Sequence, residues 1–215
     1  MSKTTVSALA LLAAAGLGSS ANAAFTMTQQ SAPAPTYSTV LNFDAPGSPT
    51  GTVASNSWLS LGVESLFSGV DSSSIDIVPV SSNPGFGWLG SGNTAVGPFG
   101  VYMKFTGQVS SLSAQYWDDS GPGSFFGGGA GVILYKNGVQ VDFLSILSPA
   151  YSPTGKSWIN IVGSGGSTFD EVDFVGFGFS PTAYVDNISW NSVPAPSAAA
   201  LLALSGLVAG RRRRT

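Results

Sequence analysis

Residues 131–144 read GVILYKNGVQVDFL and hold the clearest structural signal in the chain. Two apolar runs meet at Asn137-Gly138, a dipeptide that suits a two-residue type I′ turn because both turn positions need a positive φ. After the turn, Val139, Val141 and Phe143 face one way and the polar residues between them face the other. The stretch therefore predicts a β-hairpin with strands over residues 131–136 and 139–144.

Short apolar runs separated by turn residues continue on both sides of this hairpin, at a spacing of about 10 residues. No convincing amphipathic helix interrupts them. The pattern predicts an all-β chain folded as a single antiparallel β-sandwich. The other predicted strands cover residues 39–44, 58–67 with a break at Gly62, 75–80, 101–105, 112–117, 157–162, 171–179 and 184–190.

The composition of the 215-residue chain excludes several kinds of chemistry. Charged residues make up 9% and hydrophobic residues 43%, while 28 glycines and 13 prolines punctuate short strands. Cysteine and histidine are both absent. Disulfides, thiolate chemistry, a Ser-His-Asp or Cys-His catalytic set and histidine-bound zinc are therefore excluded.

The formal net charge of −3 hides an acidic central domain. Five of the eight basic residues lie near the two ends, as Lys3 and the cluster 211–214. Between the ends, three lysines stand against eleven acidic residues, which gives a net charge of −8. Such a domain repels the phosphates of nucleic acids and of anionic lipids, so we expect no nucleic-acid partner.

The first 23 residues have the pattern of a secretory signal peptide. Lys3 gives a basic start, residues 6–17 form an apolar run, and Ala21-Asn22-Ala23 matches the small-residue site of signal peptidase. We expect the general secretion machinery to export the chain and signal peptidase to cut after Ala23, with Ala24 as a near alternative. The other interpretation is a retained membrane anchor, for which the apolar run is short.

Residues 192–215 have three parts that together predict a sorting tail. The apolar run 198–210 would span about 20 Å as a helix, against about 30 Å of hydrocarbon, so it is marginal as a permanent anchor. The arginines after it stay on the cytoplasmic side of a membrane. The motif before the run is Val193, Pro194, Ala195, Pro196 and Ser197, and the basic cluster is Arg211, Arg212, Arg213 and Arg214.

This arrangement of motif, apolar run and arginines resembles a PEP-CTERM sorting signal. The resemblance implies a hydrophobic helix held briefly in the inner membrane, cleavage by an exosortase-like membrane protease, and delivery to the cell surface or extracellular matrix. The family's central glutamate is replaced here by Ala195, which keeps the stiffness of the motif and loses its carboxylate. The alternative is an ordinary C-terminal anchor that stays in place.

Between a linker over residues 24–36 and the tail, residues 37–191 form the predicted sandwich domain. Its first and last strands, 39–44 and 184–190, resemble those of jelly-roll carbohydrate-binding and galactose-binding-like domains. The resemblance implies that these strands pair in one sheet, and that Asp44 and Asp186 share a structural Ca²⁺. The alternative is that Asp186 and its neighbour bond only to nearby backbone.

Two groups of residues are candidates for contact with sugars. Tyr116, Trp117 and Asp118 end a predicted strand, and Trp88 lies in a loop rich in glycine and proline. Aromatic rings stack on the apolar faces of sugars while acids bond their hydroxyl groups, so both groups fit an extracellular polysaccharide. The alternative for each ring is packing in the core.

The sequence as a whole therefore predicts an exported, non-enzymatic surface or matrix protein with a structural or adhesive role and contact with polysaccharide. No cofactor is required apart from the calcium that the resemblance implies. The other function in view is a secreted glycan-degrading enzyme. Such an enzyme needs two carboxyl groups about 5 to 10 Å apart, and paired acids at residues 118–119 and 170–173 would supply them.

Overall fold

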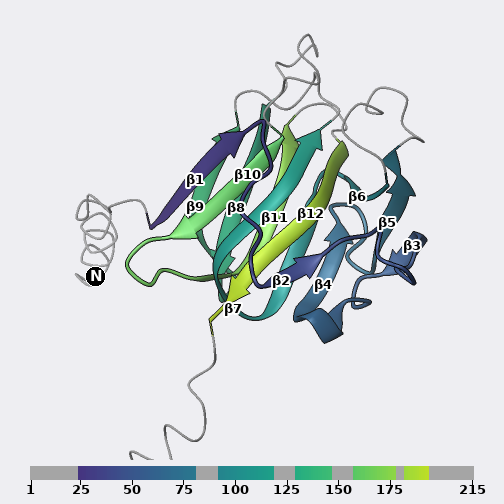
Figure 1. The fold of residues 1–215 in the computed structure, drawn as a ribbon, viewed down its shortest axis with the longest axis horizontal. Coiled ribbons are helices and arrows are strands. Elements are labelled where there is room, and N and C mark those ends of the chain that lie inside the picture. Colours follow the sequence, from purple (N-terminus) through teal and green to yellow (C-terminus); the bar gives the residue numbers. More distant parts are fainter. Residues whose placement is uncertain (1–23, 81–91, 119–128, 147–156, 178–181, 194–215) are drawn as a thin grey trace, which may run out of the picture.

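A computed structural model describes residues 24–80, 92–118, 129–146, 157–177 and 182–193 (Figure 1). Within these ranges the chain is all-β and every strand pairing is antiparallel, as the sequence predicts. The elements are β1 (Phe25–Gln30), β2 (Thr39–Leu41), β3 (Gly51–Ala54), a 3-10 turn (Leu59–Leu61), β4 (Val63–Ser68), β5 (Ser74–Pro79), β6 (Asn93–Pro98), β7 (Val101–Asp118), β8 (Gly129–Lys136), β9 (Val139–Ile146), β10 (Trp158–Gly163), β11 (Phe169–Phe177) and β12 (Thr182–Ser192).

Strand β7 is 18 residues long and belongs to both layers of the fold. Its first part, residues 101–105, pairs mainly with β4 and β11, and β8 and β9 continue this first layer. Its last part, residues 109–118, pairs with β10 and β12 in the second layer, which β1, β2, β6, β5 and β3 extend. The prediction of two separate strands here is wrong, because one continuous strand covers both of them and the residues between.

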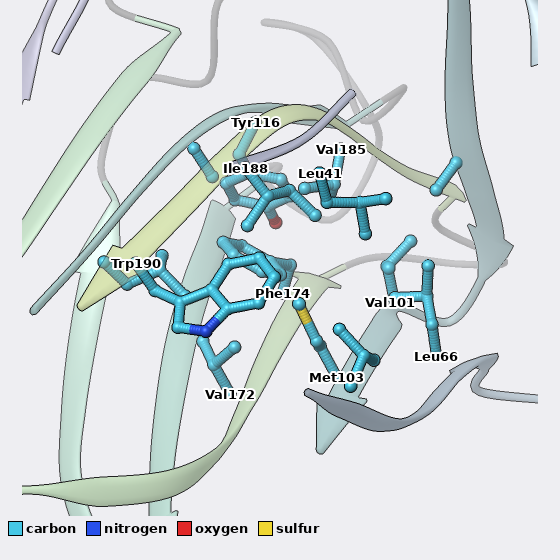
Figure 2. Packing of buried hydrophobic residues seen from close by; sticks show 14 of the residues in the cluster. Leu41, Leu66, Val101, Met103, Tyr116, Val172, Phe174, Val185, Ile188 and Trp190 are labelled. Carbon is cyan, nitrogen blue, oxygen red and sulfur yellow. The ribbon is translucent and has the colours of Figure 1, made fainter. Parts of the chain in front are cut away.

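One apolar cluster lies between the two layers, so the fold is β-sandwich-like. Figure 2 shows Met103 and Phe174 of the first layer directed toward Ile188 and Trp190 of the second. Aromatic rings also contact each other in this core: the ring centroids of Phe105 on β7 and Trp190 on β12 are 5.3 Å apart. Alternation along each strand explains this core, because every second side chain turns inward.

The predicted hairpin is confirmed. Asn137 and Gly138 have φ values of 53° and 74°, and Lys136 pairs with Val139 across the turn. The apolar side of β9 faces outward, however, with Val139, Val141 and Phe143 being 66%, 37% and 44% exposed. The hairpin strand β9 contributes mainly Leu144 to the core.

The predicted break at Gly62 is also present. Gly62 ends the 3-10 turn with a φ of 88°, a left-handed conformation that suits glycine, and β4 starts at the next residue. Trp58, just before the turn, is buried and its ring meets that of Phe43 edge-on at 5.6 Å between centroids. This turn closes one side of the core.

The predicted linker over residues 24–36 is wrong in its first half. Residues 25–30 form β1 and pair along their whole length with β10. Phe25 is only 3% exposed, and its ring contacts Phe169 with centroids 5.7 Å apart. β1 was not predicted because its residues are mostly polar. β3 and β6 were not predicted because their residues are mostly small.

The predicted terminal strands do pair, because β2 lies antiparallel to the end of β12, with Leu41 opposite Ile188. The two predicted end helices, residues 1–23 and 198–210, lie outside the described residues. In the ranges that are described, we found no helix with the length and hydrophobicity needed to cross a membrane.

Candidate functional site

The outer surface of the first layer carries a row of side chains that crosses five strands. We call it the outer row: Phe67 on β4, Tyr102 on β7, Asp173 on β11, Ile133 on β8 and Phe143 on β9. Each member stands opposite the next in the strand register. Their sequence neighbours, such as Met103 and Phe174, belong to the core, so alternation turns the row outward.

Asp173 is the unusual member of the outer row. The residue is only 4% exposed, and its Oδ1 atom has no hydrogen-bond partner. Burial, together with the charge of Glu171, raises the pKa of this carboxyl from 3.8 to about 7. A buried acceptor without a donor lowers stability by about 1 to 3 kcal/mol, so this position weakens the fold.

Two tyrosines lie on either side of Asp173. Tyr102 is its register partner on β7, and Tyr135 on β8 lies opposite Glu171. The pKa of each phenol is raised, first by burial and then by the charge of Asp173. The ring of Tyr102 also stacks on Phe67, with centroids 5.4 Å apart and planes within 12°.

The charges around the outer row are mostly negative. Lys104 is its basic neighbour, and its ammonium is held 2.7 Å from the carboxylate of Glu64. Burial raises the pKa of Glu171 against the opposing effect of Lys104. The surface therefore offers aromatic rings, a buried acceptor and an excess of acid over base.

Asp44 and Asp186, predicted to share calcium, lie close enough that the charge of Asp44 contributes to raising the Asp186 pKa. Burial is the larger cause, and the Asp186 pKa reaches about 6. Asp186 accepts from the backbone N–H of Asn187 at 2.7 Å and from its amide at 3.0 Å. Asp44 accepts from the N–H of Asn93 at 2.6 Å, and its carboxylate lies against Gly92.

These contacts fit calcium poorly. Both oxygens of Asp186 already face N–H donors, which a cation would have to displace, whereas Ca²⁺ needs six to eight oxygen ligands. The described part of the chain contains no group of three or more acidic side chains arranged for a metal. The arrangement matches the alternative interpretation, in which Asp186 and Asn187 bond to each other and to nearby backbone.

The predicted sugar-binding aromatic residues Tyr116 and Trp117 are buried. The hydroxyl of Tyr116 donates to the carbonyl of Val175 at 2.6 Å. Trp117 is 1% exposed, lies parallel to Tyr184 at 5.8 Å between centroids, and has an indole N–H without a partner. Burial fits the core-packing alternative for both rings. Trp88 and the side chain of Asp118 lie outside what the structure describes.

The acids at 170–173 separate into two roles. Asp170 accepts from the N–H of Asn137 and from the amide of Gln108, both at 2.9 Å, so it fastens the hairpin turn to the first layer. Glu171 and Asp173 instead share the outer face of β11. Both carboxyl groups have raised pKa values, and burial is the larger cause for each, with nearby acids adding to it.

Sequence reasoning missed the outer row. A signal was present, because Tyr102 and Asp173 each stand between two apolar residues inside a predicted strand. Alternation places such residues on the face opposite the core. Alternation within one strand does not reveal the register between strands, and it is this register that brings Tyr102 and Asp173 together.

Comparison with protein-family models gave no match, and comparison with curated proteins gave none either. The function therefore rests on the sequence motifs and on the geometry described above.

Proposed function

We propose that the chain is an exported surface or matrix protein, with a structural or adhesive role, that is processed at its C-terminal sorting signal. General secretion machinery and signal peptidase handle the first end, and an exosortase-like membrane protease handles the second. The protein is held briefly in the inner membrane and then reaches the cell surface. One observation supports this proposal: the first described strand starts just after the predicted signal-peptidase site, and the last described strand ends just before the predicted sorting motif.

At the N-terminal end, β1 starts two residues after Ala23. The carbonyl of Ala24 accepts from the backbone N–H of Ser164 at 2.9 Å and from its hydroxyl at 3.2 Å. Cleavage after Ala23 keeps these contacts, whereas cleavage after Ala24 removes them. The geometry therefore favours Ala23 as the site of signal peptidase action.

At the C-terminal end, β12 lies between strands on both sides and ends at Ser192. The N–H of Val193 donates to the carbonyl of Gln108 at 2.7 Å, and the proline-containing motif starts at this residue. A cut within residues 193–197 would thus leave every described strand on the released domain. This is what a detachable sorting tail requires.

The finer points of the fold belong to the same proposal. We take the sandwich to be jelly-roll-like and the two ends to be a signal helix and a sorting helix. Extracellular polysaccharide is the partner that a matrix protein of this kind meets, and the acidic domain gives no surface for nucleic acid.

A glycan-degrading enzyme is the second candidate, favoured by one observation. Glu171 and Asp173 lie two residues apart on one face of β11, about 7 Å between Cα atoms, and both pKa values are raised. Release of reducing ends from insoluble glycans by the purified domain, lost in Glu171→Gln, would support it. Binding without release supports the non-enzymatic role.

The mass of the mature protein tests the main proposal. The full chain, expressed in a Gram-negative host that carries an exosortase, should yield a surface species lacking residues 1–23 and the segment after the motif. A matched chain with Arg211 to Arg214 replaced by serine should lose the membrane stop and escape processing. An intact chain recovered from the cytosol, arginines included, would end the proposal.

A further inference from the structure

We propose that the outer row binds an uncharged polysaccharide chain, with the rings of Phe67 and Tyr102 against the sugar faces and the carboxyl of Asp173 bonded to sugar hydroxyls. This inference rests on the proposed surface function and names its partner and its site. Neither the sequence motifs nor the sugar-binding residues predicted from them include this surface.

The unpartnered Oδ1 of Asp173 is the first support. It is buried within the first layer, and none of its neighbours donates a hydrogen bond to it. A group that weakens the fold in this way is typical of a binding site, where the ligand supplies the missing partner. Because Asp173 is only 4% exposed, the side chains that cover it must move for a hydroxyl to reach Oδ1.

The aromatic and apolar members of the row are the second support. Phe67 and Tyr102 form a stacked pair at one end, and Phe143, 44% exposed, stands at the other. Five adjacent strands at about 4.8 Å spacing make the row about 19 Å long. Such a length suits several linked sugar rings, and a mixed surface of rings with few polar groups is what ligand sites use.

Charge selects among possible partners. The acids Glu171 and Asp173 share the face, and the nearby Lys104 is already paired with Glu64. A polyuronate or another anionic polymer would be repelled. A second copy of this chain, docked face to face, would bring the acids Glu171 and Asp173 of both copies into one interface, which like charge opposes. An uncharged chain rich in hydroxyl groups satisfies the carboxyl without these penalties.

The test uses a fragment of residues 24–193, which contains every residue of the core cluster from Phe25 to Trp190 and is expected to fold alone. The fragment is incubated with microcrystalline cellulose, insoluble β-1,3-glucan and chitin, and with calcium alginate beads as the anionic arm. We expect retention on at least one neutral polymer and none on alginate. Tyr102→Ala and Asp173→Asn should each reduce the affinity about tenfold, the size of one lost ring contact or charged hydrogen bond.

Leu59→Ala is the matched control, because Leu59 is an apolar side chain that is 55% exposed in the 3-10 turn and is not a member of the outer row. It should leave retention unchanged. Retention unaffected by either outer-row variant, retention on alginate alone, or no retention of the parent fragment would each overturn the inference. If Tyr102→Ala unfolds, Asp173→Asn decides, since its removal of a buried charge favours folding. None of these results bears on cleavage at the two ends. The proposed export and sorting are tested separately, by the mass of the mature protein.

Discussion

The hydroxyl of Tyr116 donates a 2.6 Å hydrogen bond to the carbonyl of Val175, and both residues are buried. Tyr116 lies in the part of β7 that belongs to the second layer, whereas Val175 lies on β11 in the first. This bond therefore joins the two layers through the core. It also explains why the phenol points inward, away from any sugar at the surface.

Tyr116→Phe should lower the free energy of unfolding by about 1 to 2 kcal/mol, because the Val175 carbonyl loses its donor in a dry environment. Urea denaturation of the 24–193 fragment measures this. Tyr37→Phe is the comparison, since the Tyr37 hydroxyl donates to Asn160 at 2.6 Å in a partly buried position and water can replace it at less expense. Unchanged stability with lost polysaccharide retention would return Tyr116 to a sugar-binding role.

Asp173 should make the domain less stable as the pH rises from about 4 to about 7. Its pKa is about 7 in the folded state and ordinarily 3.8, so the folded protein holds an extra proton in this window. The stability that this extra proton contributes is fully present below pH 3.8 and is lost as the pH rises through about 7. Glu171 on the same strand, and Tyr102 and Tyr135 on the flanking strands, face this carboxyl. Asp186, with a pKa of about 6, acts in the same direction.

Melting curves between pH 4 and pH 8 measure this effect in Asp173→Asn. The variant should gain about 4 kcal/mol over the parent at pH 8 and little at pH 4, because only the charged form is penalised. Asp71→Asn is a control of opposite sign. Hydrogen bonds from Ser74 and Ser73 hold the pKa of Asp71 near 2, so its contribution is fully present above about pH 4 and is lost as the pH falls toward 2, which melting curves extended below pH 4 measure. An identical pH profile for parent and Asp173→Asn would contradict the buried charge.

Calcium should not shift the melting temperature of the 24–193 fragment. Both carboxylate oxygens of Asp186 accept hydrogen bonds from Asn187. Asp44 accepts a hydrogen bond from the N–H of Asn93, and its carboxylate lies against Gly92. Thermal melting with millimolar calcium or with EDTA measures this. A rise with calcium that disappears in Asp186→Ala would show a metal site and remove the present interpretation.

Phe25→Ala should lower the free energy of unfolding by about 3 kcal/mol, the usual effect of emptying a buried phenylalanine site. The ring lies against Phe169, and the strand that carries it pairs with β10. Val193→Ala is the control at the other end of the domain, where the side chain is 40% exposed. A linker would tolerate both changes equally, so equal denaturation midpoints would restore the linker interpretation.

The parts of the fold that the sequence predicts are those with local signals. Asn137-Gly138 needs only its own backbone preferences to form a turn, and Gly62 marks its break in the same way. β1 was not predicted, because its short polar sequence forms a strand only through its pairing with β10. The inward direction of Tyr116 and the isolation of Asp173 depend on which strands lie above and beside them, and residues distant in sequence set that register.

The central position of β12 has a mechanical consequence. In the membrane-held state that we propose, a pull on the domain would enter the chain at residue 193, directly after β12. This strand pairs antiparallel with β7 along nearly its whole length, and with β6 and β2 on its other edge. Traction along the strand must therefore shear many hydrogen bonds at once instead of breaking them one by one, so the strand would resist a pull applied through the proposed sorting tail.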